Sequence, residues 1–310
     1  MKVVSIAVAL FLAGTAQAQE TCPVELIVLG VAQDGGAPQM GRHDDPAWDD
    51  PSLRRLAVSL GLAHHETGDR FLFEATPDIR AQFRALDEFE PGDGEGPVVD
   101  GVFLTHAHMG HYTGLMFFGH ESMGAQNVPV FAMPRMAEYL STNGPWSQLV
   151  AYGNIDLRVM EAHDGFGIAP GVNVTTFRVP HREEFSEVVG YRIRGPNRSV
   201  LFIPDIDSWE DWDGAGVQIE EMIANVDIAF LDATFFANGE IPGRDMSGFP
   251  HPRVVESMER FADLPASERA KVHFIHFNHT NPLRFLDSPE RAQVEAAGFH
   301  VADEGDQHCL

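Results

Sequence analysis

Three histidines stand within six residues near the middle of the chain, in the pattern His106-x-His108-x-x-His111. Imidazole is the nitrogen ligand that zinc prefers in proteins. The pattern directly follows an apolar run, residues 98–104, that predicts a buried strand, and a loop leaving a strand can turn three side chains toward one point. The alternative is an exposed histidine cluster, while the mid-chain position excludes a purification tag. The spacing therefore predicts a metal site.

Other apolar runs predict strands that alternate with helices along the chain. Polar residues that can bind a metal recur at the ends of these strands, where a layered α/β architecture carries its ligand residues. No internal repeat or linker divides the chain, so one domain is expected over residues 19–310. Strands are predicted at 24–29, 56–60, 71–74, 98–104, 128–132, 172–179, 188–194, 200–203, 226–231, 272–277 and 299–302, and helices at 77–89, 112–118, 135–141, 252–262 and 289–297.

The histidine segment resembles the His-x-His-x-Asp-His signature of the metallo-β-lactamase superfamily. The resemblance implies an α/β fold, an αββα sandwich that holds one or two metal ions between its sheets. It covers essentially the whole mature chain, because further residues match in the family's order. The metal ligands that it implies are His106, His108, His111, His181, Asp205 and His276.

Two carboxylates have further roles on the same resemblance. Asp205 follows the run 200–204 and matches the carboxylate that bridges two metal ions. Asp78 follows the strand and turn over 71–77 and matches an early structural aspartate, which is expected to hold an imidazole in one tautomer. Both residues are therefore expected to contribute to catalysis.

One position departs from the family pattern. Gly110 stands where the signature has an aspartate that normally binds the second metal ion. The second site is then empty, weaker, or completed by another residue. His279 lies three residues beyond His276 in a turn-rich segment, and its position agrees equally well with a metal-binding or catalytic role and with a structural role. The other candidates are Asp34, His43 and Asp207, for which a loop or surface role is favoured.

Within the superfamily, three segments resemble pyrroloquinoline quinone biosynthesis protein B and its relatives. They are residues 28–39 with Gly-Gly-x-Pro-Gln, residues 74–82, and residues 276–282 with His-Phe-Asn-His-Thr-Asn-Pro. The full set of central histidines and the N-terminal leader described below differ from what that biosynthetic family implies. The chain is therefore interpreted as a relative with hydrolytic metal chemistry.

The function that follows is an exported, metal-dependent hydrolase of a small ester, lactone, amide or phosphodiester. The expected cofactor is Zn2+, one or two ions, with iron or manganese as alternatives. Zinc lowers the pKa of a bound water from about 15.7 to about 7, so a zinc-bound hydroxide is the expected nucleophile. No Gly-x-Ser-x-Gly segment offers a serine in its place.

Three other functions stay open. A β-lactamase agrees with export, although Gly110 and the Gly190-Tyr191 segment agree with it less well. A metal-dependent oxidoreductase or cofactor-binding protein related to quinone biosynthesis would use iron or require oxygen. The third is a protein that keeps the fold and binds a ligand without catalysing a reaction, and the retained histidines argue against this function.

The first 18 residues have the layout of a secretory signal peptide. A short basic start precedes an apolar run, and Ala-Gln-Ala provides small residues for cleavage. The run is shorter than the ~20 residues that a membrane-spanning helix needs, which disfavours an N-terminal anchor. The mature protein is therefore expected to be periplasmic or secreted, without a membrane span.

The formal net charge of −25 argues against nucleic acid and anionic membranes as partners, because an acidic surface repels phosphate. A small-molecule substrate is the expected partner, and the oligomeric state is left open. The two cysteines, Cys22 and Cys309, stand at opposite ends of the mature chain. Export makes a disulfide between them as plausible as two free thiols, and neither is expected to be a nucleophile.

Overall fold

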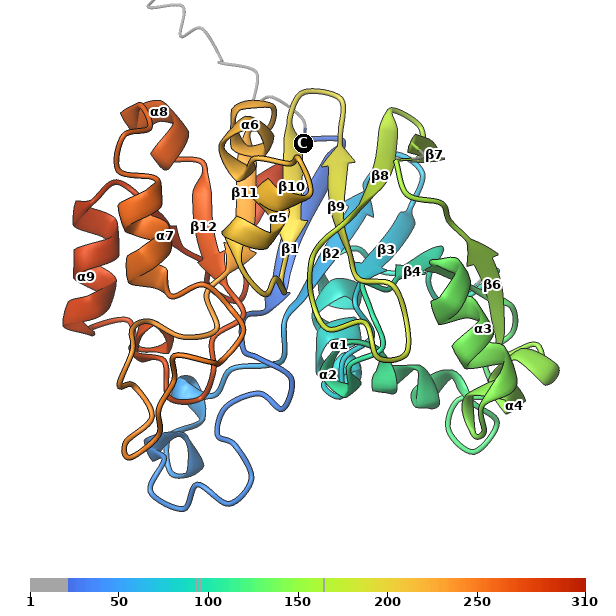
Figure 1. Cartoon of the computed structure of the whole chain (residues 1–310). Helices are drawn as coiled ribbons and strands as arrows, with labels where there is room; N and C mark the ends of the chain where they lie inside the picture. The colour runs from blue at the N-terminus through green and yellow to red at the C-terminus, as the bar shows by residue number, and fades with distance from the viewer. Residues whose placement is uncertain (1–21, 93, 95, 164) are drawn as a thin grey trace, which may run out of the picture.

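Two seven-stranded β-sheets form the centre of the protein, and helices cover the outer face of each (Figure 1). The computed structural model describes residues 22–92, 94, 96–163 and 165–310, so the predicted signal peptide, residues 1–18, lies outside the described residues. This architecture is the α/β, αββα sandwich that the sequence predicted, and the prediction of the fold is confirmed.

The first sheet joins both ends of the described chain. Its order is β14-β1-β2-β3-β4-β5-β6, antiparallel from β14 to β3 and parallel from β3 to β6. These strands are β1 (Val24–Gly30), β2 (Ser59–His64), β3 (Asp69–Phe73), β4 (Gly101–Phe103), β5 (Val128–Ala132), β6 (Ile155–Val159) and β14 (Gln307–Cys309).

The second sheet has the order β13-β12-β11-β10-β9-β8-β7, antiparallel from β7 to β10 and parallel from β10 to β13. Because β10, β11 and β12 run in the same direction, their carboxyl ends meet at one edge. The strands are β7 (Gly165–Ala169), β8 (Val172–Arg178), β9 (Val189–Arg194), β10 (Ser199–Ile203), β11 (Ile228–Asp232), β12 (Val272–Ile275) and β13 (His300–Val301).

The helices divide between the two outer faces (Figure 1). Helices α1, α3 and α4 lie on the side of the first sheet, and α5, α6, α7 and α9 on the side of the second. No helix in the described ranges is long and apolar enough to cross a membrane. The helices are α1 (Ile79–Phe89), α2 (Met109–Tyr112), α3 (Pro134–Thr142), α4 (Trp146–Ala151), α5 (Trp209–Gly214), α6 (Ile219–Ala224), α7 (Val254–Arg260), α8 (Ala266–Arg269) and α9 (Pro289–Ala296), with 3₁₀ turns η1 (Pro46–Trp48), η2 (Pro51–Leu53), η3 (Thr113–Phe118) and η4 (Pro282–Arg284).

One apolar core lies between the sheets. The rings of Phe73 on β3 and Tyr191 on β9 lie 5.5 Å apart, and Phe73 stacks on Phe103 of β4 at 4.9 Å. A second apolar cluster, with Leu86 of α1 and Leu140 of α3, lies on the outer side of the first sheet. Strands covered on both faces need apolar residues at every position, which explains the unbroken apolar runs of the sequence.

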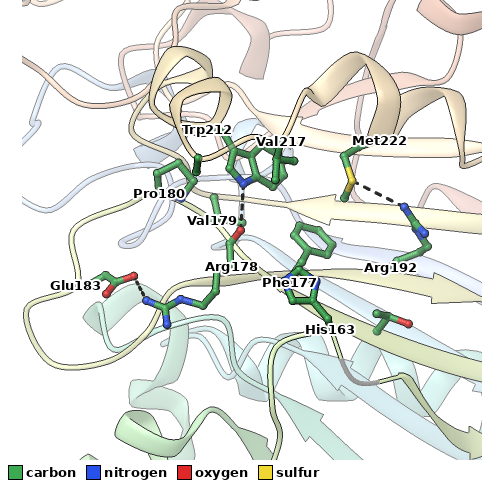
Figure 2. A pocket seen from close by; sticks show the side chains of 12 residues that line it. His163, Phe177, Arg178, Val179, Pro180, Glu183, Arg192, Trp212, Val217 and Met222 are labelled. Carbon is green, nitrogen blue, oxygen red and sulfur yellow. Dashed lines mark hydrogen bonds and ion pairs between the residues drawn. The ribbon is translucent and has the colours of Figure 1, made fainter.

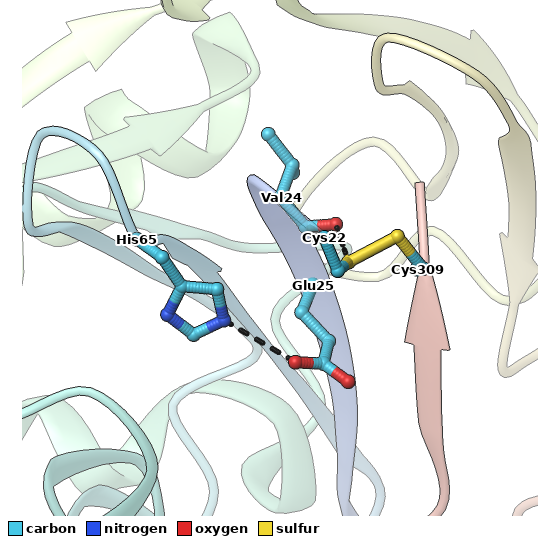
Figure 3. The surroundings of a disulfide bond; sticks show 5 residues. All are labelled: Cys22, Val24, Glu25, His65 and Cys309. Carbon is cyan, nitrogen blue, oxygen red and sulfur yellow. Dashed lines mark hydrogen bonds and ion pairs between the residues drawn. A yellow bond between two sulfur atoms is a disulfide. The ribbon is translucent and has the colours of Figure 1, made fainter. Parts of the chain in front are cut away.

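A disulfide links the first strand to the last (Figure 3). Cys22 and Cys309 have Cα atoms 5.6 Å apart, and β1 pairs with β14 through Leu26 and His308. Of the two states that the sequence left open for these cysteines, the structure contains the disulfide. The bond closes a loop across 287 positions of the chain.

Replacing both cysteines with serine is expected to lower the free energy of unfolding by about 2–5 kcal/mol, because the bond limits the freedom of the unfolded chain. The measurement is urea unfolding of the Cys22→Ser/Cys309→Ser variant against the oxidised and the reduced wild type. The reduced wild type is expected to match the variant. Equal stability of all three proteins would contradict the prediction.

Acid stability is expected to depend on a histidine cluster. Burial lowers the pKa of His273 from its ordinary 6.5 to about 3, and the neighbouring His300, His308 and Arg198 act in the same direction. In the unfolded chain, His273 therefore becomes protonated below about pH 6.5, whereas in the folded protein it stays neutral down to about pH 3.

Within that window, stability is expected to fall by up to about 1.4 kcal/mol for each pH unit of acidification. A His273→Gln variant is expected to show a shallower loss when thermal unfolding is followed from pH 7 to pH 4. The exposed His120, changed to glutamine, is the control. Parallel pH profiles for wild type and the His273→Gln variant would show that the cluster does not set acid stability.

Candidate metal centre

The six predicted ligands converge at one edge of the sandwich. Five of them lie in the loops that follow strands β4, β8, β10 and β12. The sixth, His111, lies in the short helix α2, which is below the sheets in Figure 1. Their donor atoms form groups in which all members lie within 4.8 Å of one another. Five of the six are buried and His108 is half-buried. The structure thus brings together every residue that the sequence proposed as a ligand.

Three imidazole nitrogens form the first donor set. His108 Nδ1 lies 2.9 Å from His106 Nε2 and 3.2 Å from His181 Nε2. Nitrogens bound to one tetrahedral zinc ion are about 3.3 Å apart, given Zn–N bonds of about 2.0–2.1 Å. The spacing of the three nitrogens therefore fits a single zinc ion.

Asp205 lies at the centre of the site. Its Oδ2 is 2.9 Å from His111 Nε2 and 3.6 Å from the Nε2 atoms of both His106 and His276. Its Oδ1 is 3.8 Å from His181 Nε2. Burial acts to raise the pKa of Asp205, but the surrounding histidines outweigh it and hold the pKa well below its usual range. An ionised carboxylate that faces His106 and His181 of the first donor set, and also His111 and His276, can bridge two metal ions, which is the role expected for Asp205.

Each ligand histidine has its other ring nitrogen held by a polar partner. A partner that accepts the N–H of one nitrogen leaves the lone pair of the other nitrogen facing the centre, which is how proteins orient metal-binding imidazoles. The pairs are His106 Nδ1 with Thr105 Oγ1 at 2.8 Å, His108 Nε2 with Glu184 at 3.1 Å, His111 Nδ1 with Glu74 at 3.3 Å, His181 Nδ1 with Asp207 at 2.8 Å and His276 Nδ1 with Thr234 Oγ1 at 2.9 Å.

Two buried nitrogens of the site make no hydrogen bond of acceptable geometry. They are His111 Nε2, which faces Asp205 Oδ2 at 2.9 Å, and His276 Nε2, and both residues are fully buried in the described chain. An unsatisfied buried polar group costs about 1–3 kcal/mol. A cation between them would accept both lone pairs, so these residues fit a metal ion.

Backbone strain is concentrated at the site. Six non-glycine residues of the described chain have positive φ, and four of them are Asp34 (32°), Glu74 (84°), His251 (84°) and His276 (71°). Each such conformation costs on the order of 1–3 kcal/mol, and strain of this kind persists where function fixes a side chain.

The expected role of Asp78 is wrong. Its carboxylate accepts a hydrogen bond from the Ala57 backbone N–H at 2.9 Å and reaches no imidazole in the described structure. Asp78 lies beyond Pro77, at the start of α1, whereas Glu74 follows β3 directly and turns toward His111. Glu74 also accepts a hydrogen bond from Thr105 Oγ1. The carboxylate that orients His111 is therefore Glu74.

Of the four candidates for the missing aspartate, only Asp34 joins the donor groups, together with His111 and His276. Asp207 orients His181 instead, and His43 is exposed. His279 contributes no atom to these groups, although the sequence offered it a metal or catalytic role. Burial lowers the pKa of His279, and Arg42 and Arg284 act in the same direction. The structure therefore places His279 outside the donor groups.

His251 is a site residue that the sequence did not indicate. Its Nδ1 lies 2.7 Å from Asp232 Oδ2 and 3.4 Å from Asp205 Oδ1. Burial acts to lower the pKa of His251, but Asp232 and Asp205 outweigh it and raise the pKa above its usual value. His251 lies in the long loop between β11 and α7, where no apolar run precedes it. Asp232, by contrast, closes the predicted strand 226–231, and that position was a usable signal.

A separate cavity of about 430 Å³ lies between β8, β9 and helices α5 and α6 (Figure 2). None of its described lining residues belongs to the donor groups. Trp212 donates its indole N–H to the Arg178 carbonyl at 3.1 Å, and Arg178 forms an ion pair with Glu183. These contacts hold Arg178 and Glu183, which lie on either side of His181 in the chain, and the cavity itself lies outside the donor groups.

The comparisons with known proteins agree with this geometry. Residues 69–277 match the family described as the beta-lactamase superfamily domain. Coenzyme PQQ synthesis protein B from Methylorubrum extorquens is 26% identical over 308 residues, covering 91% of this chain and 98% of the relative. The protein of the same name from Gluconacetobacter diazotrophicus is 28% identical over 321 residues, with coverage of 91% and 98%.

Crystal structures agree as well. Zn(2+)-bound PqqB from Methylobacterium extorquens matches with a TM-score of 0.76 at 25% identity, covering 92% of this chain and 100% of that one. A diphosphatase from the PhnP family has a TM-score of 0.64 at 23% identity, covering 93% and 98%, and this likeness shows the fold alone. Zinc is the metal that the donor set and the first of these structures support, and iron or manganese can use the same kinds of donor. The chain belongs to the beta-lactamase superfamily and has the metallo-β-lactamase fold.

Proposed function

We propose that this protein is a metal-dependent hydrolase of a small ester, lactone, amide or phosphodiester. The observation that carries the proposal is the convergence of His106 Nε2, His108 Nδ1 and His181 Nε2 beside the ionised Asp205. Such a set binds zinc while leaving room for further ligands, which is the arrangement of catalytic rather than structural zinc sites.

A bound zinc ion lowers the pKa of a water and polarises a carbonyl or phosphoryl oxygen. The protein's own residues supply the rest of the chemistry. Asp205 is placed to orient the attacking water because its two oxygens face both groups of histidines. His251 is held through Nδ1 by Asp232, with Asp205 Oδ1 at 3.4 Å, and is the buried group that we assign to protonate the leaving group.

Two exposed apolar side chains are next in sequence to residues of the site. Met109 follows His108 and is 74% exposed, and Phe185 follows Glu184, the partner of His108, and is 59% exposed. Exposed apolar side chains beside a polar centre suit a small organic substrate. This combination supports an ester, lactone or amide as well as an aryl phosphodiester.

The test is turnover by protein of known metal content. The panel contains p-nitrophenyl butyrate, a γ-lactone, a p-nitroanilide, bis-p-nitrophenyl phosphate and a chromogenic cephalosporin. At least one is expected to be hydrolysed, with activity lost on chelation and restored by zinc. Hydrolysis of the cephalosporin alone would favour the β-lactamase alternative. No turnover of any substrate by stoichiometrically zinc-loaded protein would remove the proposal.

The similarity to coenzyme PQQ synthesis protein B favours a second candidate, a metal-dependent oxidoreductase or cofactor-binding protein. Imidazole and carboxylate donors also suit iron. Oxygen uptake by iron-loaded protein in the presence of a quinone precursor tests this function. Uptake that requires iron, together with no hydrolysis by the zinc form, would replace the first proposal by the second.

We also propose that the protein is exported and acts in the periplasm or outside the cell. The disulfide between Cys22 and Cys309 supports this, because such bonds persist in oxidising compartments. The measurement is cell fractionation with the mass of the recovered protein. A periplasmic or secreted chain that begins near residue 19 is expected, and a full-length chain confined to the cytoplasm would contradict export.

A further inference from the structure

The space beside Gly110 is already occupied by a residue from another part of the chain. A Cβ atom at position 110 would lie 2.2 Å from Asp34 Oδ1 and 2.3 Å from Asp34 Cα. These distances are far below any contact between non-bonded atoms, and one of them is to the backbone. Any side chain at position 110 is therefore incompatible with Asp34 as it lies here, and the two residues compete for one place.

Asp34 faces the two histidines that have unsatisfied nitrogens. Its Oδ1 lies 3.3 Å from His111 Nε2, and a carboxylate oxygen of Asp34 also lies within 4.8 Å of a ring nitrogen of His276. The side chain is 49% exposed, so the carboxylate lies between the buried histidines and solvent.

Backbone pairing fixes the position of this loop. The Gln33 N–H donates to the Phe277 carbonyl at 2.8 Å, and the Phe277 N–H donates to the Val31 carbonyl at 2.8 Å. Ala32 also forms a bridge to Ala57 on its other side. The chain just before Asp34 is thus paired with the residue that follows His276. The carboxylate and this histidine are held together by main-chain hydrogen bonds.

We propose that Asp34 supplies the carboxylate of a second metal site, in place of the aspartate that Gly110 lacks. The site consists of Asp34, His111 and His276, with Asp205 shared with the first set. Gly110 is then the residue that admits Asp34, so the departure from the family pattern preserves two metal ions. This inference rests on the proposed function, because it extends the same metal centre.

Zinc content per chain tests the inference directly. The wild type is expected to bind two equivalents of zinc, measured by mass spectrometry after dialysis against metal-free buffer. Asp34→Ala and the isosteric Asp34→Asn are each expected to bind one. His108→Ala, which removes a donor of the first set, is the matched comparison and is expected to lose the other equivalent.

A reciprocal exchange provides the sharper test. Gly110→Asp alone is expected to lose zinc or stability, because its Cβ meets the Asp34 backbone. Asp34→Gly/Gly110→Asp is expected to regain the second equivalent, because glycine removes the side-chain clash and its wide range of backbone angles lets the Cα at position 34 move away from the new Cβ. Cobalt-substituted protein gives a second readout, in which spin coupling between two ions is present in the wild type and absent in Asp34→Ala.

The outcomes separate this inference from the proposed function. Two equivalents in Asp34→Ala, with the spin coupling intact, would overturn the inference. A wild type that binds one equivalent and keeps it in Asp34→Ala would also overturn it, while leaving the hydrolase proposal in place. A wild type without stoichiometric zinc would remove both.

Discussion

Replacement of His108 by alanine is expected to remove zinc from the first donor set and to lower kcat/KM by on the order of 10³-fold or more. His108 Nδ1 lies between the other two nitrogens of the set, 2.9 Å from His106 Nε2 and 3.2 Å from His181 Nε2. Two imidazoles and a shared carboxylate then remain. They bind zinc more weakly, and the lowered pKa of the attacking water is lost with the ion.

The variant is expected to fold, because His108 is only half-buried and lies at the surface end of its loop. Its thermal unfolding in chelator should therefore match that of metal-free wild type. Exposed His43, changed to alanine, is the control and should keep the wild-type zinc content and kcat/KM. Full activity of the His108→Ala variant at saturating zinc would show that this histidine does not hold the catalytic metal.

Replacement of His251 by glutamine is expected to lower kcat by about 10²–10⁴-fold with zinc content unchanged. His251 lies between two carboxylates, with Nδ1 at 2.7 Å from Asp232 and 3.4 Å from Asp205. Glutamine keeps a polar side chain of similar length there but cannot deliver a proton. The loss should therefore appear in kcat rather than in metal binding.

The pH profile distinguishes this role from a structural one. His251 must be protonated to donate, and its carboxylate neighbours raise its pKa despite burial. The rate should fall as pH rises through that raised pKa, and this alkaline limb should disappear in the His251→Gln variant. His279→Gln, measured alongside, tests the sequence-based expectation for that residue. A His251→Gln variant that keeps both the wild-type kcat and the alkaline limb would exclude proton donation by His251.

Most of the sandwich could be predicted from local sequence, and the elements that were missed include an edge strand and short helices. Strands β1 and β10 were expected within two residues of their observed ends, because nearly all of their residues are buried and apolar. Strand β5, in which buried and half-buried residues alternate, was expected at its observed bounds. Strand β6 was not predicted, since it is an edge strand with exposed and half-exposed residues over most of its length. Helices α4, α5 and α6 have six residues each, too few for a periodic apolar pattern to be recognised.

The six predicted ligands could be named before the structure, because His106, His108, His111, His181, Asp205 and His276 lie at or shortly beyond the ends of apolar strands and match the order of the family that the chain resembles; the structure brings them to one edge. Which other residues reach that edge became visible only in the folded protein. Asp34 takes the space left by Gly110, Glu74 rather than Asp78 orients His111, and His251 enters from a loop without regular structure. Ligands at strand ends are marked by local patterns. The approach of one loop to another depends on main-chain pairing between distant segments, such as Gln33 with Phe277, which no local pattern encodes.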